Sequence, residues 1–134
     1  MLRVLGEGLS LRVDVAREGA MKITAYDFGR VDIEGKAYTS DVIIMPGKVK
    51  SDWWRKEGHR LRIEDLGDVV EAEPELLVVG TGYYGRMAIP AETRDYLESK
   101  GIKVHAARTG EAVQEFNRRR QEGWRIVAAL HLTC

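Results

Sequence analysis

The sequence LLVVGTGYYG, residues 76–85, opens the part of the chain that decides the fold. Its first four residues form a short, wholly apolar run, which is typical of a strand buried on both faces of a sheet. Pro90 suits the first position of a helix over residues 91–100, and Gly101 suits the left-handed position after it. With a second strand over residues 102–106, this stretch predicts a strand, helix, strand unit with parallel neighbours.

The same pattern continues downstream. Thr109 can cap a helix whose apolar stripe begins at Ala112, and Gly123 can end it before a strand over residues 125–130. Because apolar parallel strands need helices on both faces, the second half of the chain predicts a layered α/β fold.

The first half shows the alternation of antiparallel strands, with a Glu34-Gly35 turn between two of them. Pro46-Gly47 interrupts this run, an extended piece starts at Lys48, and a helix is expected over residues 64–71. We therefore predict a three-layer α/β domain with a mixed central sheet, antiparallel in its N-terminal part and parallel in its C-terminal part. The expected N-terminal strands cover residues 9–15, 22–28, 31–33, 36–38 and 41–45.

Composition limits the classes of function. The chain has 134 residues, the size of one domain, and its 21 basic residues balance its 21 acidic ones, so no overall field attracts nucleic acid or membranes. The single cysteine, Cys134, excludes an intrachain disulfide and indicates a reducing compartment. The N-terminal segment lacks the pattern of a targeting peptide, and no apolar stretch is long enough to cross a bilayer. We expect a cytoplasmic protein without membrane insertion.

The motif Gly80-Thr81-Gly82-Tyr83-Tyr84-Gly85 fits G-x-G-x-x-G, the pattern of dinucleotide-binding loops. In such loops a helix begins within the motif and binds the pyrophosphate, whereas here the helix is expected only after Pro90. The acidic ribose ligand expected about twenty residues downstream is also missing. We interpret the motif as a tight turn that needs small residues, and we expect no cofactor.

The position of this turn is informative. Ligands of open α/β sheets usually bind beyond the carboxyl ends of the parallel strands. Backbone amides there, with Arg86 and Arg108 nearby, could hold a small anion, although a solvated loop with ordinary arginines is the simpler interpretation. The residues expected along this edge are Gly80, Thr81, Gly82, Arg108 and Thr109.

Aromatic and basic residues alternate over residues 53–62, WWRKEGHRLR. This composition occurs in nucleic-acid-binding surfaces, but a neutral chain with one such cluster does not favour nucleic acid. Trp53, Trp54 and Arg55 are better suited to contact with a protein partner, where Trp and Arg dominate the energetics. Tryptophans packed under the sheet are the alternative. The run from Arg118 to Arg120 is interpreted as a solvated helix face.

Catalytic and metal-binding patterns are absent from the sequence. His59, His105 and His131 lack metal-ligand spacing, and one cysteine cannot form a thiolate cluster. We interpret His131 as a core histidine and Cys134 as unreactive. His59 has a polar, loop-like setting and is the first candidate acid or base if the protein is an enzyme.

Several stretches resemble one protein family. They are residues 23–29 (ITAYDFG), 53–65 (WWRKEGHRLRIED), 77–85 (LVVGTGYYG) and 109–134, which ends VAALHLTC. The chain is similar over residues 21–134 to a small superfamily first described from a methanogen protein of unknown function. That superfamily includes the adipogenesis-associated domain protein and a mitochondrial assembly factor for respiratory complex I.

The resemblance implies a three-layer α/β fold with a mixed sheet and no firmly assigned enzymatic activity. It also implies that Gly80, Thr81 and Gly82 border a surface cleft, with Tyr83 and Tyr84 beside it. Residues 1–20 lie outside the similarity, so we expect them to be an extension, such as an extra strand pair, before a single domain at 21–134.

Two functions remain open. The first is a non-catalytic binding or assembly module with a protein partner. The second is a protein or enzyme that binds a small anionic ligand in the same cleft, with Arg86 and Arg108 facing the anion. Pairing of edge strands would allow a homodimer. The candidate site residues are Trp53, Trp54, Arg55, His59, Gly80, Thr81, Gly82, Tyr83, Tyr84, Arg86, Arg108 and Thr109.

Overall fold

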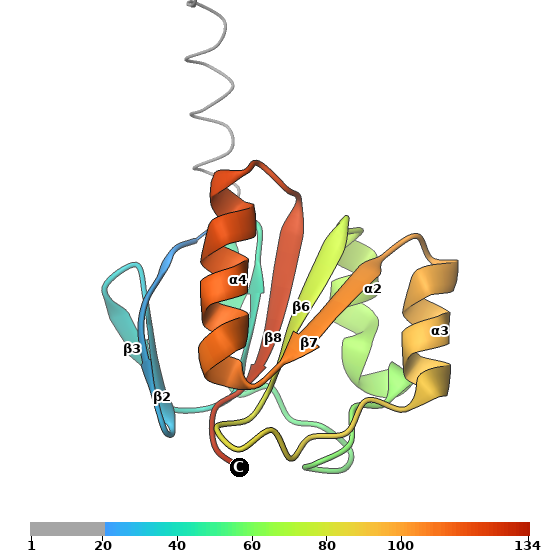
Figure 1. Ribbon diagram of the computed structural model, residues 1–134, viewed down its shortest axis with the longest axis horizontal. Helices are drawn as coiled ribbons and strands as arrows, with labels where there is room; N and C mark the ends of the chain where they lie inside the picture. The colour runs from blue at the N-terminus through green and yellow to red at the C-terminus, as the bar shows by residue number, and fades with distance from the viewer. Residues whose placement is uncertain (1–20) are drawn as a thin grey trace, which may run out of the picture.

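A computed structural model describes residues 21–134, and the predicted strand over residues 9–15 lies outside the described residues. The described chain contains two β-sheets and the helices that pack on them (Figure 1). Strands β1 (Ile23–Asp27), β2 (Arg30–Ile33) and β3 (Lys36–Tyr38) form a small antiparallel sheet. The predicted turn at Glu34-Gly35 joins β2 to β3, so this hairpin is confirmed.

The central sheet has the strand order β5-β4-β8-β6-β7. Strand β8 pairs in parallel with β6 on one side and antiparallel with β4 on the other, and this makes the sheet mixed. Strand β7 continues the parallel part and β5 the antiparallel part. The bounds are β4 Val42–Met45, β5 Lys48–Lys50, β6 Leu76–Thr81, β7 Lys103–Ala107 and β8 Ile126–His131.

Two hydrophobic cores cover the two faces of this sheet. On one face, Phe116 of α4 (Thr109–Gln121) and Val31 of the small sheet pack on Ile44 and Val78. The other core includes residues of η1 (Ile63–Leu66), α2 (Gly67–Ala72) and α3 (Ala91–Ser99). The predicted α/β class, with a mixed sheet between covering layers, is confirmed.

The structure refines several boundaries. Strands β1 to β3 form a sheet of their own, so the antiparallel part of the central sheet is β4 and β5 alone. The helix expected over residues 64–71 is a 3-10 turn followed by the short helix α2. Pro90 lies just before α3, in an extended conformation with ψ 151°, instead of at its first helical position.

The prediction that Thr109 caps α4 is wrong. Arg108 occupies the cap position, and Thr109 is the first residue of the helix. The Thr109 side chain is fully buried, and its hydroxyl is bonded to the backbone of two other segments. An oxygen used in this way cannot accept from the amides of its own helix.

Candidate functional site

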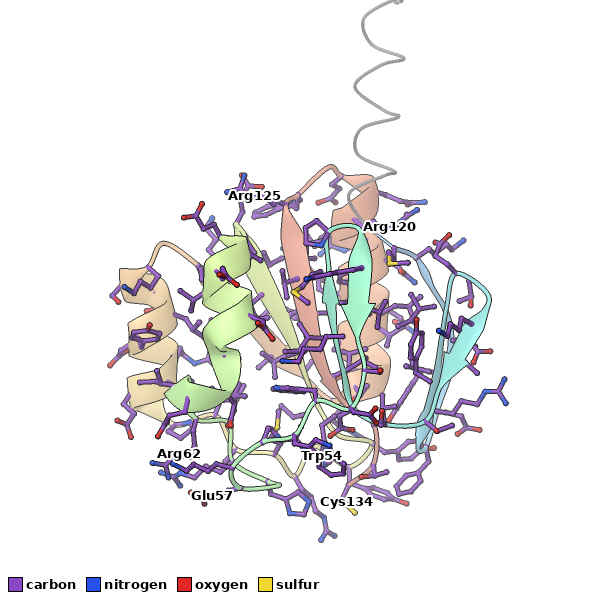
Figure 2. All side chains as sticks on the ribbon, turned by 180° about the vertical axis from the view of Figure 1, so that it is seen from behind. Trp54, Glu57, Arg62, Arg120, Arg125 and Cys134 are labelled. Carbon is purple, nitrogen blue, oxygen red and sulfur yellow. The ribbon has the colours of Figure 1, made fainter. Side chains whose placement is uncertain are left out.

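The parallel strands end together at one end of the molecule, as expected. Thr81, the last residue of β6, is in register with His131, the last residue of β8 (Figure 1). Trp54, Glu57, Arg62 and Cys134 lie at this end, whereas Arg120 and Arg125 lie at the opposite one (Figure 2).

The turn after β6 needs glycine for close packing. A Cβ atom at Gly80 would lie 2.7 Å from the Thr109 hydroxyl oxygen, and one at Gly82 would lie 2.4 Å from the carbonyl group of Cys134. Gly82 also has φ of +112°, which side chains rarely permit. The interpretation of the motif as a tight turn is confirmed, and amides of the turn donate to backbone carbonyls and to the Thr109 hydroxyl of the protein itself.

The last residues of the chain link four segments. The carbonyl of Leu132 accepts from the amide of Gly29 and from the Tyr26 hydroxyl, at 2.9 Å each. The Leu132 amide donates to Asp41 Oδ1 at 2.8 Å. The amides of the turn after β6 donate to the carbonyls of Thr133 and Cys134. The segment after β8 therefore fixes the loops that surround it.

Thr109 joins the turn to β8. Its hydroxyl accepts from the Gly82 amide at 2.9 Å and donates to the His131 carbonyl at 2.6 Å. We expect Thr109→Val to destabilise the domain by about 2 kcal/mol, because two buried backbone groups lose their partner. Urea unfolding measures this loss. Thr109→Ser keeps the hydroxyl and should recover most of it; a Thr109→Val variant as stable as the wild type would mean that the hydroxyl does not contribute to stability.

A buried polar cluster lies beneath the loop over residues 53–62. Asp41 Oδ2 is 2.8 Å from Arg55 Nη2 and 2.8 Å from His131 Nδ1. The side chains of Arg55 and His131 are only 5% and 7% exposed. A carboxylate, a guanidinium and an imidazole thus share one site that water scarcely reaches.

The loop holds Arg55 in a single position. The Arg55 Nε donates to the Gly58 carbonyl at 3.0 Å, and its guanidinium lies 4.8 Å from the Trp53 ring centroid. Trp53 is itself buried and donates from Nε1 to the carbonyl of Asp65 at 3.1 Å. The alternative that the tryptophans pack under the sheet is therefore correct for Trp53, whereas Trp54 is 82% exposed.

His59 lies over the cluster. Its ring is exposed and stands edge-on to His131, with 5.6 Å between the centroids. The His59 carbonyl accepts from the Ala88 amide at 2.8 Å, which fixes the loop at this residue. The candidate acid or base is thus a neighbour of the buried histidine.

Asp41 is the negative charge of the cluster. Burial acts to raise the pKa of its carboxyl, but hydrogen bonds from His131, the Leu132 amide and Arg55 outweigh burial and lower this pKa. Asp41 is therefore ionised at neutral pH and accepts hydrogen bonds from the groups around it.

Two buried nitrogen atoms of the cluster lack partners. Arg55 Nη1 and His131 Nε2 have no hydrogen-bond partner among residues 21–134. Unpaired buried polar atoms are rare in folded proteins, and each one calls for an explanation. The interpretation of His131 as a satisfied core histidine holds for Nδ1 and not for Nε2.

Aromatic rings gather beside this end of the sheet. Phe28, Tyr83 and Tyr84 contact one another, with ring centroids 5.1 to 6.3 Å apart. Tyr84 is 59% exposed and Phe28 49%. We call these three residues the aromatic patch. Exposed aromatic clusters on a folded domain commonly mark contact surfaces.

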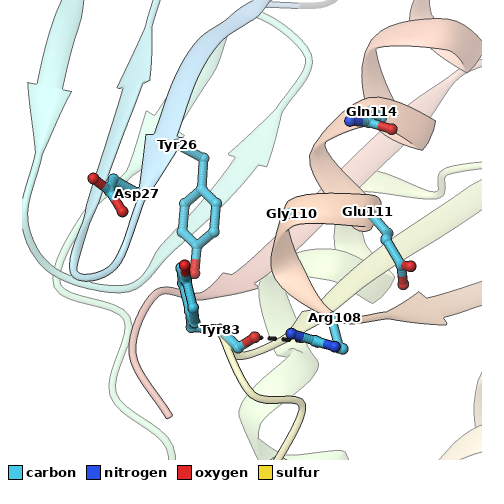
Figure 3. A pocket seen from close by; sticks show the side chains of 7 residues that line it. All are labelled: Tyr26, Asp27, Tyr83, Arg108, Gly110, Glu111 and Gln114. Carbon is cyan, nitrogen blue, oxygen red and sulfur yellow. Dashed lines mark hydrogen bonds between the residues drawn. The ribbon is translucent and has the colours of Figure 1, made fainter.

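A groove of about 420 Å³ lies next to the patch (Figure 3). Tyr26 and Asp27 of β1 line one side, and the first turns of α4 line the other. Arg108 reaches across its end, where Nε donates to the Tyr83 carbonyl at 3.2 Å. Burial raises the pKa of Tyr26 to about 12, so its hydroxyl stays protonated. The groove carries two carboxylates, Asp27 and Glu111, against one arginine.

The structure does not bring the predicted site residues together in one place. Arg55 and His59 belong to the buried cluster, whereas Tyr83, Tyr84 and Arg108 belong to the patch and its groove. Arg86 is exposed just after the turn, and Gly80, Thr81, Gly82 and Thr109 form the structural turn itself. Sequence analysis did not identify Asp41, Tyr26 and Phe28 as site residues.

Residues 21–134 contain neither a metal cluster nor a membrane-spanning helix. Within this part of the chain, no group of three His, Cys, Asp or Glu side chains is arranged to hold a metal ion. No helix described there has the length and apolar character needed to span a membrane.

Known proteins resemble the chain over most of its length. The profile of a family described as "Protein of unknown function (DUF498/DUF598)" matches residues 23–131. The conserved hypothetical protein PH1505 of Pyrococcus horikoshii OT3 is 30% identical; the match covers 85% of this chain and 100% of that one, with a TM-score of 0.72. The structure described as MT938 is 26% identical over 86% of this chain and 100% of that one, with a TM-score of 0.70.

A third structure supports the fold. A Mth938-like domain of Bordetella pertussis, solved by NMR in solution, is 23% identical over 84% of this chain and 85% of that one, with a TM-score of 0.63. The resemblance noted in the sequence is confirmed. The chain belongs to the DUF498/DUF598 family of proteins of unknown function.

Proposed function

We propose that this domain is a non-catalytic binding or assembly module that captures a protein partner through the aromatic patch. The observation that carries the proposal is the mutual contact of Phe28, Tyr83 and Tyr84 at the surface. Because the three rings already contact one another, they lose little conformational entropy when a partner covers them. Aromatic residues also dominate binding energy at interfaces. The sheet and the segment after β8 serve as a rigid support.

The arginines beside the aromatic patch favour a partner segment that carries a carboxylate next to its apolar side chains. Arg86 is exposed beside the patch, and its side chain has no ion-pair partner within the described range. Arg108 lies on the other side of Tyr83. By contrast, Arg118 and Arg119 on α4 are engaged with Glu115, which argues against a nucleic-acid-binding face there.

Removing a patch ring should weaken capture without unfolding the domain. For Tyr84→Ala and Phe28→Ala we expect partner retention on an affinity column to fall about tenfold, because exposed aromatic anchors supply much of an interface's energy. Retained proteins are identified by mass spectrometry, and the thermal midpoint shows that the fold is intact. Tyr96→Ala, on the remote helix α3, is the matched control. Undiminished retention of every partner by both variants would refute the proposal.

The second candidate function is binding of a small anionic ligand in the same cleft, with or without catalysis by His59. The groove supports it only weakly, because Asp27 and Glu111 repel an anion that Arg108 attracts. His59 lies over the buried cluster and does not line the groove. The geometry therefore favours protein binding.

Oligomeric state is open to a direct test. The central sheet ends in the short strands β5 and β7, and pairing through either edge would give a homodimer. A native mass spectrum of the untagged protein distinguishes monomer from dimer and reveals a retained ligand. We also propose that the domain works in the cytoplasm, which its single cysteine supports.

A further inference from the structure

We infer that Arg55 Nη1 and His131 Nε2 form a binding site for a small carboxylate, which is taken up together with one proton. This site is separate from the aromatic patch and does not depend on the proposed protein-binding function. Five steps lead to it: the fixed arginine, the orientation of the histidine, the contact between the two side chains, the charge balance and the cover.

The Arg55 guanidinium is held ready to bind. Nε is bonded to the Gly58 carbonyl and Nη2 to Asp41, while the central carbon of the guanidinium lies 4.8 Å from the Trp53 ring centroid. Nη1 is the remaining nitrogen, fully buried and without a partner among the residues described. Since a guanidinium has only donors, Nη1 requires an acceptor oxygen.

Asp41 fixes the orientation of His131. Because Asp41 is ionised, His131 Nδ1 carries a proton and donates to Oδ2 at 2.8 Å. The contact of 3.0 Å between Nδ1 and Arg55 Nη2 then joins two donors that share one oxygen. A neutral imidazole of this tautomer leaves Nε2 as an acceptor, and a charged one makes it a second donor.

The two unpaired atoms belong to side chains that contact each other. Each belongs to the same planar group as a nitrogen of the 3.0 Å contact, Nη1 to the guanidinium and Nε2 to the imidazole. A carboxyl group offers an acceptor to Nη1 and a second oxygen to Nε2. Planar pairing of this kind is how arginine sites recognise carboxylates.

Charge balance requires a proton. Arg55 and Asp41 cancel, so the cluster is neutral while His131 is neutral. A carboxylate that enters with one proton on Nε2 keeps it neutral, whereas burying an unbalanced charge is strongly unfavourable. A metal cation fits poorly, because Nη1 offers only hydrogen atoms.

The ionisable groups around His131 are few. Asp41 precedes β4, and Arg55 and His59 lie on the covering loop. Tyr26 of β1 binds the neighbouring Leu132 carbonyl and stays protonated. The exposed residue His59 is the cover: its ring stands edge-on to the His131 ring, with 5.6 Å between the centroids.

The experiment titrates the whole protein with sodium formate and follows the imidazole nitrogens by two-dimensional 1H–15N NMR. We expect the His131 Nε2 signal to move to the protonated position on formate addition, while the His105 nitrogens stay unchanged. Because each carboxylate takes up one proton, the dissociation constant should rise about tenfold for each pH unit. A His131 spectrum that formate leaves unchanged, or affinity independent of pH, would overturn the inference.

Variants separate this site from the surface arginines. Arg55→Lys keeps the charge but loses the planar set of N–H donors, and His131→Gln removes the group that accepts the proton. Each variant should abolish the formate response. Arg86→Gln and Arg108→Gln should leave it intact, and loss of the response in these two would overturn the inference. If a cluster variant fails to fold, the formate titration of the wild-type protein decides the inference by itself.

Two further probes identify the source of the carboxylate. Acetate represents free small acids, and a tripeptide with a free C-terminus represents a partner's chain end. Binding of acetate alone assigns the site to a metabolite, whereas binding of the tripeptide assigns it to a protein partner. If the site bound inorganic phosphate and none of the carboxylates, the inferred planar pairing with a carboxylate would be refuted.

Discussion

Asp41→Asn is expected to lower the free energy of unfolding by about 3–5 kcal/mol, the range for removing one partner of a buried ion pair. The Arg55 side chain is 5% exposed, so its charge would remain buried without a counter-charge. The amide can still accept from Leu132, so the loss reports the charge and not the backbone contact. Urea unfolding at pH 7 measures the difference.

The exposed pair of Arg30 and Asp32 provides the control, because solvent screens surface ion pairs. Asp32→Asn should leave the unfolding midpoint almost unchanged. If Asp41→Asn were equally silent, the buried cluster would not contribute to stability.

The pH dependence follows from the pKa of Asp41, which lies below its ordinary value in the folded protein. The stability that ionised Asp41 contributes is fully present above the unfolded-state pKa of about 3.9. It is lost as the pH falls through the lower pKa of the folded protein. The stability gap between wild type and Asp41→Asn should therefore narrow as the pH falls below about 4. A gap that widened in acid would contradict the assignment of an ionised Asp41.

Gly82→Ala is expected to destabilise the domain by about 2–3 kcal/mol and to release the segment after β8. A side chain at φ of +112° is strained by itself. Its Cβ would also lie 2.4 Å from the backbone of Cys134, so the bond between the Tyr83 amide and the Thr133 carbonyl must lengthen. Hydrogen exchange at the amides of Tyr83 and Arg86 should accelerate well beyond the global change.

Gly110→Ala is the matched control. A Cβ at Gly110 meets no atom within 4 Å, and the residue lies in α4, where alanine is favoured over glycine. This variant should be neutral or slightly more stable. Equal losses in both variants would show that the close approach to Cys134 is not the cause.

Sequence patterns predicted the fold well because they are local. The apolar run over residues 76–79 reports one buried strand, and the pattern over residues 22–45 reports the successive strands β1 to β4. Thr109 shows the limit of such patterns. A threonine before an apolar stripe has the features of a cap, and only the approach of Gly82 and His131 shows that its hydroxyl is used elsewhere.

The buried cluster could not be predicted from the sequence, for a related reason. Asp41 and His131 are 90 positions apart in the sequence, and no spacing rule joins them. Arg55 and His59 were identified through the composition of their loop, but that composition indicated a surface. Their contact with His131 depends on the turn of the loop around Trp53, which buries one tryptophan and exposes the next.

The position of β8 has a consequence for how the protein is made. This strand comes after every other strand that the structure describes, yet it lies between β4 and β6, which do not pair with each other. Strands β4 and β6 emerge from the ribosome long before β8, so the strand edges that pair with β8 stay unpaired until β8 emerges. The central sheet can close only after residue 131 has left the exit tunnel, so β4 and β6 stay unjoined until nearly all of the described chain is free of the ribosome.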